Sequence, residues 1–246
     1  MKHWVSSVAR RLLSVQTRRK IVSYAQWPPV GFVRFGSLRR LHPISRSFGF
    51  ERGQPVDRYY IAKFLARHSS DVRGHVLEVL DDTYTRAYGG DRVTRSDVLH
   101  LNERRPGVTI LGDLTKPEDF APAQYDCVIL TQTLPFIFDV AAVVTTVHTI
   151  LRPGGVALVT VPGICQISRY DMDHWGQFWA FTTLSVRQLF EAQFGKGSVH
   201  VESHGNVVAA IALLHGVAAG ELRRRELEFR DEDYQVLITI RAVRSA

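Results

Sequence analysis

The amino-acid sequence predicts a doubly wound α/β fold with a mostly parallel, seven-stranded sheet, preceded by a helical N-terminal arm. Short apolar segments rich in β-branched residues recur from residue 75 onward, as expected for strands covered on both faces. Helical patterns and loops separate these segments, so strands and crossovers alternate. The 246 residues, 45% hydrophobic and 22% charged, suffice for one large core and exclude disordered, collagen-like and disulfide-framework classes.

The first third of the chain differs from the rest in charge. Residues 1–73 hold 15 Lys or Arg against 3 acids, a net charge of +12, whereas residues 74–246 carry a net charge of −5. This change coincides with the onset of the strand pattern. It predicts a basic arm and helical cap over residues 1–73 and a separate α/β domain over residues 74–246. An anionic partner would suit the arm, but nucleic acid is not expected because no nucleic-acid-binding module is recognisable.

Two helices are expected in the basic part. The spacing of apolar residues over residues 1–22 predicts an amphipathic helix whose arginines lie outside its apolar side. Four interpretations of it stay open: a peripheral anchor on a membrane surface, a targeting peptide, a docking helix for another protein, or a helix packed on its own domain. The second helix is expected over residues 55–68, where Pro55 precedes an apolar side.

The α/β domain is expected to begin with five short strands, followed later by two more. They are residues 75–80, 92–98, 108–114, 125–133, 156–161, 199–203 and 234–243. Helices are expected over residues 139–151, 184–194 and 207–222. The interval between the first two strands shows little helical pattern.

Two further observations bear on location. No apolar segment approaches the roughly 20 residues of a membrane-spanning helix. Cys127 and Cys165 lie in apolar contexts and match no metal-ligand spacing, as expected for buried free thiols in a reducing compartment. We therefore expect a cytoplasmic protein, associated with a membrane only if residues 1–22 form an anchor.

Polar side chains gather where the predicted strands end. In an open α/β sheet, ligands bind beyond the carboxyl ends of the strands, near the point where the strand order reverses. Glu78 lies in the first strand and is followed by Asp82 and Thr83. Asp97 is expected to end the second strand, and Asp113 lies at the end of the third. Acids there can accept hydrogen bonds from ribose hydroxyls and from an adenine amino group. Because no phosphate-binding glycine loop is present, an adenosine ligand without phosphates is expected.

These motifs, taken in order, resemble class I S-adenosylmethionine-dependent methyltransferases of the type-11 kind, found among small-molecule and sugar methyltransferases. The motifs are VLEV at 76–79, Asp97, GDL at 112–114, YDCVILTQTL at 125–134 and LRPGG at 151–155. The resemblance implies a Rossmann-like fold, S-adenosylmethionine as cofactor and S-adenosylhomocysteine as product. It implies that Asp97 holds the ribose and Asp113 the adenine amine. It also implies that Leu114 packs on the adenine, while Thr131 and Gln132 line the methionine end.

The first loop departs from the family pattern. The family has E-x-G-x-G-x-G there, with glycines that allow the backbone to approach the cofactor closely. Residues 78–84 contain no glycine. Either side chains such as Asp82 and Thr83 replace the backbone contacts, together with Glu78, or cofactor binding is reduced or lost.

The acceptor site is expected within residues 167–182, a segment dense in acids and aromatic residues. In related methyltransferases the equivalent region flanks the substrate pocket. The resemblance implies a small-molecule acceptor, and we expect methyl transfer to a hydroxyl of a sugar or secondary metabolite. Such a hydroxyl must lose its proton, and His174, Asp173 and Asp171 are the candidate bases. The alternative is that both acids only cap or solvate a loop and that His174 is exposed.

Other functions stay open at this stage. A relative with lost or altered cofactor use could bind a metabolite or a partner enzyme, or catalyse a cyclisation that needs no methyl donor. A membrane-associated enzyme held by residues 1–22 is a third hypothesis. His200, Glu202 and His204 share one face of a strand at a spacing that could ligate a metal, but a solvated strand face is expected and no metal site is predicted.

Overall fold

The structure, a computed structural model, describes Ser14, Thr17, Pro28 and residues 32–245. The chain divides after His42 into two compact units, Met1–His42 and Pro43–Ala246. In the first unit a 3₁₀ turn spans Gly36–Leu38. Apart from Ser14 and Thr17, the helix predicted over residues 1–22 lies outside the described residues. Within the described part of the chain, no helix is both long and apolar enough to cross a membrane.

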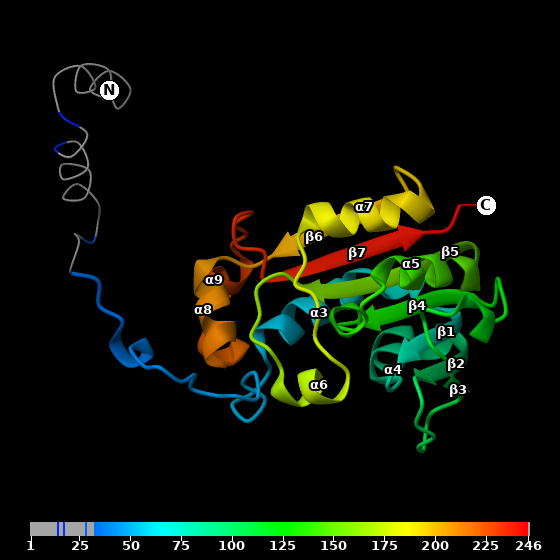
Figure 1. Cartoon of the computed structure of the whole chain (residues 1–246), viewed down its shortest axis with the longest axis horizontal. Coiled ribbons are helices and arrows are strands. Elements are labelled where there is room, and N and C mark those ends of the chain that lie inside the picture. The colour runs from blue at the N-terminus through cyan, green and yellow to red at the C-terminus, as the bar shows by residue number, and fades with distance from the viewer. Residues whose placement is uncertain (1–13, 15–16, 18–27, 29–31, 246) are drawn as a thin grey trace. The chain divides into compact units, whose positions relative to one another are not determined.

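A seven-stranded sheet forms the centre of the second unit (Figure 1). Its strands, in chain order, are β1 (Gly74–Val79), β2 (Val93–His100), β3 (Ile110–Leu111), β4 (Tyr125–Thr131), β5 (Leu151–Pro162), β6 (Val199–His204) and β7 (Leu237–Val243). Their order across the sheet is β3-β2-β1-β4-β5-β7-β6. The first five strands pair in parallel, and β7 pairs antiparallel with both β5 and β6. The predicted fold class and sheet are therefore confirmed.

Helices cover both faces of this sheet. They are α3 (Val56–Arg67), α4 (Thr83–Gly89), α5 (Val140–Ile150), α6 (Arg169–His174), α7 (Thr183–Phe194), α8 (Val207–His215) and α9 (Arg224–Glu228). One apolar cluster joins α5 and α7 to the sheet, and a second joins α3 and α8 to the opposite face. Neighbouring residues of β4 alternate between the two, with Val128 in the first cluster and Cys127 in the second. This alternation explains why the central strands are apolar throughout.

Several boundaries differ from the sequence-based expectation. The helix expected over residues 207–222 ends at His215 as α8, because Gly216 takes the left-handed conformation that terminates a helix. β2 continues through His100 instead of ending near Asp97. Strand β3 is reduced to two residues, and residues 151–155 begin β5 instead of only ending the preceding helix. A short helix, α4, fills the interval in which no clear helical pattern is visible, because Glu78 stabilises its first turn from the strand below.

Helix α3 belongs to the same unit as the sheet. Ile61 and Leu65 are completely buried against the second cluster. After α3, the Asp71 carboxylate accepts two hydrogen bonds from the Arg241 guanidinium of β7, at 2.8 and 3.0 Å. The structural division after His42 thus lies earlier than the boundary at residue 73 that the charge pattern suggested.

Shortening the side chain of Ile61 tests how firmly α3 is packed. We expect Ile61→Ala to lower the free energy of unfolding by about 2–5 kcal/mol, because it leaves a cavity in a completely buried position, whereas Ile61→Val costs about 0.5–1.5 kcal/mol. Urea unfolding followed by circular dichroism measures both. Equal stability of the alanine variant and the wild type would contradict the packing of α3 on the sheet.

Candidate functional site

A cavity of about 260 Å³ lies at the carboxyl ends of the central parallel strands. Leu80 follows β1 and Gln132 follows β4, and both line it. The first turn of α3 contributes Asp57 and Arg58, and residues around α6 complete the wall. The strand order reverses between β1 and β4, so the cavity occupies the position in which open α/β sheets bind ligands.

Strained backbone is concentrated in the walls of this cavity. Among the described residues, four that are not glycine have a positive φ, and three of them line the cavity. These are Phe48 at φ 57°, Leu80 at 75° and Gln132 at 54°. A left-handed conformation costs a residue with a Cβ roughly 1–2 kcal/mol and persists where the surrounding structure demands it. Such residues cluster at binding and active sites, which marks this cavity as the candidate functional site.

Gln132 presents an unsatisfied acceptor beside two opposite charges. Its side-chain oxygen is buried and has no hydrogen-bond partner, while its amide nitrogen donates to the Asp57 carboxylate at 3.4 Å. The guanidinium carbon of Arg58 lies 6.0 Å from the centre of the exposed Phe50 ring. A buried acceptor without a donor is costly, so a ligand that donates a hydrogen bond here would be favoured. The cavity therefore offers a carboxylate, an amide oxygen and a guanidinium to one ligand.

The loop after β1 uses acidic side chains to organise its own backbone. Glu78 is buried and accepts hydrogen bonds from the Tyr84 and Thr85 amides at 3.1 and 2.7 Å, and from the Thr85 hydroxyl at 2.7 Å. Burial raises the pKa of Glu78 to about 7, although these three donors act in the opposite direction. Asp81 accepts from the Thr83 amide at 2.9 Å. The amides at the start of α4 are thus occupied by carboxylates of β1 and of the loop that follows it.

The other loop residues expected at the cofactor do not line the main cavity. Thr83 lines a neighbouring hollow together with Arg58, and Asp82 lines a third hollow and pairs with Arg86 at 2.7 Å. Leu80 takes the first glycine position of the family pattern in a left-handed conformation. Its carbonyl accepts a hydrogen bond from Arg105 at 3.1 Å. Leu80 thus adopts, without being a glycine, a conformation that glycine adopts most readily.

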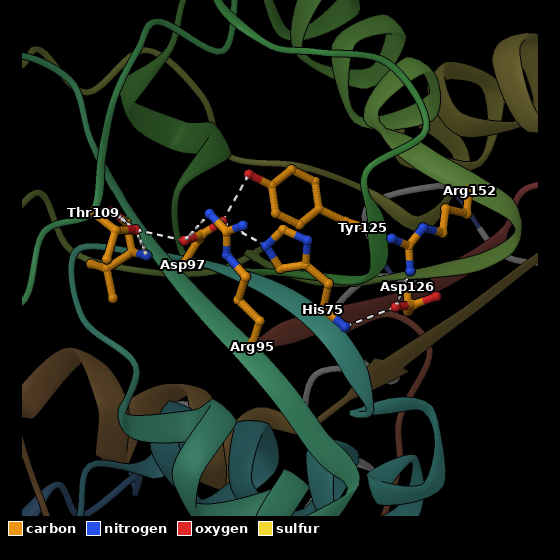
Figure 2. A network of polar contacts seen from close by, with 8 residues as sticks. His75, Arg95, Asp97, Thr109, Tyr125, Asp126 and Arg152 are labelled. Atoms are coloured by element: carbon orange, nitrogen blue, oxygen red, sulfur yellow. Dashed lines mark hydrogen bonds and ion pairs between the residues drawn. The ribbon is translucent and has the colours of Figure 1, made fainter.

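Asp97 lies inside β2 and does not line the cavity. Figure 2 shows its carboxylate in a network of polar contacts with His75, Thr109 and Tyr125. It pairs with Leu77 in the middle of β1, and the residue is 2% exposed. The His75 imidazole lies 2.6 Å from its carboxylate, and Thr109 donates a hydrogen bond at 3.0 Å. Burial alone raises the pKa of Asp97, but the contacts with His75 and Thr109 outweigh it and hold the pKa below its usual value. The expected place of Asp97 at the end of the strand is thus wrong; three further residues of β2 follow it.

Asp113 and Leu114, expected at the adenine, lie beyond β3. The Asp113 carboxylate is partly exposed and accepts hydrogen bonds from the Thr115 amide at 2.9 Å and hydroxyl at 2.8 Å. Leu114 is 4% exposed and packs in the first apolar cluster. Neither residue lines the cavity that contains Thr131 and Gln132. The structure thus brings the methionine-end candidates together and leaves the adenine candidates outside this cavity.

One of the three candidate bases lines the cavity. Asp171, in the first turn of α6, is part of its wall. Asp173 is exposed and forms an ion pair with Arg169 at 2.6 Å. His174 is exposed, and its ring stacks on Tyr170 with centroids 4.1 Å apart.

Sequence reasoning missed Asp57 and Arg58, which lie in the part of the chain assigned to the arm. Pro55 indicates where the helix begins, so Asp57 and Arg58 can be assigned to its first turn from the sequence. The sequence does not indicate which strand ends this first turn faces. Leu80 carries no sequence signal of its left-handed conformation, because a residue with a Cβ rarely adopts it. Cys127 is a free buried thiol, and Cys165 is a free, half-buried thiol that lines the cavity.

The strand face of His200, Glu202 and His204 has local partners. Glu202 pairs with Arg67 at 2.6 Å, and His204 stacks on Tyr60 with centroids 5.6 Å apart. Burial lowers the pKa of His204 to about 4. Among the residues that the structure describes, no group of three or more His, Cys, Asp or Glu is arranged to hold a metal ion.

Comparison with known proteins connects this site to a family. Residues 72–159 match the family described as a methyltransferase domain. The structure is similar to that of a methyltransferase from Haloferax volcanii, solved in complex with the Trm112 methyltransferase activator. The identity is 16%, the TM-score is 0.52, and the match covers 82% of this chain and 94% of the other. No curated protein matches the chain.

A second solved structure is the N-methyltransferase NodS from Bradyrhizobium japonicum in complex with S-adenosylhomocysteine. Its identity is 12% and its TM-score is 0.49, over 79% of this chain and 90% of that one. The match over residues 72–159 indicates methyltransferase activity. The likeness to the Haloferax structure supports the α/β fold alone.

The role of Asp97 can be tested by separating folding from binding. We expect Asp97→Asn to lower the free energy of unfolding by about 1–3 kcal/mol, because it weakens the hydrogen bonds that the buried carboxylate makes with His75 and Thr109. The affinity of the folded variant for S-adenosylhomocysteine should stay within a factor of about two of the wild type, since the side chain does not line the cavity. Urea unfolding and calorimetric titration provide the two values. A stable variant with much weaker binding would instead return Asp97 to the ribose.

Proposed function

We propose that this chain, a class I S-adenosylmethionine-dependent methyltransferase, transfers a methyl group to a hydroxyl of a small molecule such as a sugar or secondary metabolite bound in the cavity at the ends of β1 and β4. The observation that supports this site most strongly is the buried, unpartnered oxygen of Gln132 in a cavity that Asp57 and Arg58 also line. These three groups match the ammonium and carboxylate of an amino acid. S-adenosylmethionine ends in such a group, so the residues present fit the methionine end of the cofactor.

The three side chains then have distinct roles. The Gln132 oxygen and the free capacity of the Asp57 carboxylate accept hydrogen bonds from the α-ammonium group. Arg58, which lies at the border between the main cavity and the neighbouring hollow, pairs with the α-carboxylate. Asp82 and Thr83 stay candidates beside this end, and Asp113 stays a candidate for the adenine amine. Asp97 acts from inside the sheet, as support for β1 and β2.

Asp171 is the base that the cavity favours. When bound, the cofactor supplies an already activated methyl carbon, so positioning provides much of the catalysis. An acceptor hydroxyl still has to lose its proton, and the Asp171 carboxylate is the group in the cavity wall that can take it. The amide of Gln177 and the backbone near Ser168 border the same space and can orient other hydroxyls of the acceptor.

Two further proposals concern the cellular compartment and a partner of residues 1–22. The two free cysteines are compatible with a reducing compartment such as the cytoplasm. Residues 1–22 are a candidate for contact with a membrane surface or another protein. The cavity of the second unit suits a small-molecule acceptor, and binding of that acceptor requires no membrane or protein contact.

The proposed binding of the amino-acid end can be tested with two ligands that differ only in that end. We expect Asp57→Asn and Arg58→Met each to weaken binding of S-adenosylhomocysteine by about 10- to 100-fold, the value of one charge-assisted hydrogen bond. Binding of 5′-methylthioadenosine, which lacks the amino-acid group, should be unchanged. Calorimetric titration measures both ligands.

Arg52→Met is the matched control, because Arg52 is an exposed arginine that pairs with Glu221 and does not line the cavity. It should leave both affinities unchanged. An equal loss for both ligands in the Asp57 and Arg58 variants would contradict the proposed contacts and point to a general disturbance of the cavity.

The assignment of the base is tested by three substitutions within α6. We expect Asp171→Asn to lower kcat by about 10²- to 10⁴-fold while S-adenosylhomocysteine affinity is retained. Asp173→Asn and His174→Ala should change kcat by no more than a few-fold, because both side chains are exposed outside the cavity. The readout is transfer of radiolabelled methyl from S-adenosylmethionine to a pool of hydroxyl compounds. A large loss in His174→Ala with none in Asp171→Asn would reverse the assignment.

A further inference from the structure

Exposed aromatic side chains border the cavity on the side of α6. Phe138 and Tyr170 are 69% and 67% exposed, and Phe178 and Trp179 are 48% and 39% exposed. Together we name these four residues the aromatic rim. Large aromatic rings at such exposure lose the favourable free energy of burial, so a cluster of them indicates a surface that contacts something else.

Three rings of the rim are held in place by one another and by the backbone. The Trp179 indole nitrogen donates hydrogen bonds to the carbonyls of Ile137 and Phe138, both at 3.2 Å. Phe138 stacks on Trp179 with centroids 5.7 Å apart and an interplanar angle of 29°. Phe138 also meets Phe178 edge-on, with centroids 5.5 Å apart and an angle of 77°. Their orientation is therefore set before any ligand arrives, which lowers the entropic cost of binding.

The rim is continuous with the cavity along the chain. Pro135 and Phe136 line the cavity, and Phe138 follows two residues later. Gln177 lines the cavity and Phe178 comes directly after it. The Phe178 amide donates a hydrogen bond to the Pro135 carbonyl at 2.8 Å, which joins the two segments directly. The same two segments thus present polar groups to the cavity and rings to the surface.

Polar groups adjoin the rings along the chain. Arg169 and Asp173 form an exposed ion pair in α6, which also carries Tyr170, and the side-chain oxygen of Gln177, the residue before Phe178, accepts a hydrogen bond from the Ser168 amide at 3.0 Å. Exposed ring faces with planar polar groups in the neighbouring positions suit a sugar. The C–H face of a sugar ring packs on an aromatic face, while hydroxyls around its edge exchange hydrogen bonds with carboxylates, amides and guanidinium groups. An anionic lipid surface fits less well, because Asp173 neutralises the Arg169 charge within the rim.

We propose that the acceptor is a saccharide of more than one unit, whose methylated unit enters the cavity while a neighbouring unit stacks on the aromatic rim. This proposal rests on the proposed function and narrows its acceptor class. The cavity selects the reacting hydroxyl through Asp171 and Gln177, and the rim supplies affinity from outside the cavity. Binding should therefore increase with saccharide length.

The test uses the full-length protein with S-adenosylhomocysteine and a printed array of saccharides from one to six units. Array hits are then titrated in solution by calorimetry. We expect oligosaccharides to bind at least about 10-fold more tightly than the matching monosaccharide. Phe138→Ala and Tyr170→Ala should each remove most of that gain, and neither should change the affinity for the monosaccharide or for S-adenosylhomocysteine.

Phe229→Ala is the matched control, because Phe229 is 64% exposed and lies after α9, outside the rim. It should leave every affinity unchanged. A blank array with intact S-adenosylhomocysteine binding would overturn the saccharide proposal and leave the methyltransferase function standing. An affinity for saccharides that is independent of saccharide length or of Phe138 would overturn it as well. The same holds if the protein sediments with vesicles of phosphatidylserine and phosphatidylcholine and Phe138→Ala abolishes this sedimentation. Failure of S-adenosylhomocysteine itself to bind would instead count against the proposed function.

Discussion

The parallel pairing of β1 with β4 is the constraint on which the rest of the site depends. Leu77 pairs with Val128 and Glu78 with Ile129, so two strands far apart in the sequence end side by side. The chain leaves β1 toward β2 on one side and leaves β4 toward β5 on the other. The segments that follow therefore diverge, and a crevice opens between Leu80 and Gln132. Side chains from α3 and α6 can reach a ligand there because both helices border this crevice.

The same pairing explains why backbone strain gathers at this point. A strand that must stop beside its neighbour and turn away within one residue requires a left-handed conformation, which glycine normally supplies. Leu80 and Gln132 adopt it with full side chains. In exchange, Gln132 presents an amide to the cavity, and the Leu80 carbonyl receives Arg105. The side chain after β1 is thus apolar, and the polar group of this pair comes from Gln132 after β4.

Features that depend on neighbouring residues in the sequence could be predicted, whereas features that depend on contacts between distant residues could not. The strands and most of the long helices are local patterns of apolar residues, and the structure confirms that they exist, although β3 is reduced to two residues and the helix expected over residues 207–222 ends at His215. Helix α4 was missed because its first turn is stabilised by Glu78, a residue of the preceding strand. Asp97 was misplaced because strand ends are set by pairing with a neighbour, and β2 extends to His100 along β1 and β3. Sequence patterns cannot show which of three nearby candidate bases in α6 faces a cavity; the helical turn assigns that position to Asp171.

The uneven charge of the chain places a boundary at residue 73, whereas the two compact units of the structure divide after His42. A net charge of +12 over residues 1–73 averages over segments with different surroundings. Within that range, Asp57 and Arg58 are neighbours in the first turn of α3, and both line the cavity. Their opposite charges cancel in the net charge of the segment. Side by side in a cavity wall, however, they form a dipole that a zwitterion can complement. In the proposed binding of the cofactor, the relevant electrostatic feature is therefore this local pair of opposite charges, which the net charge of residues 1–73 does not reveal.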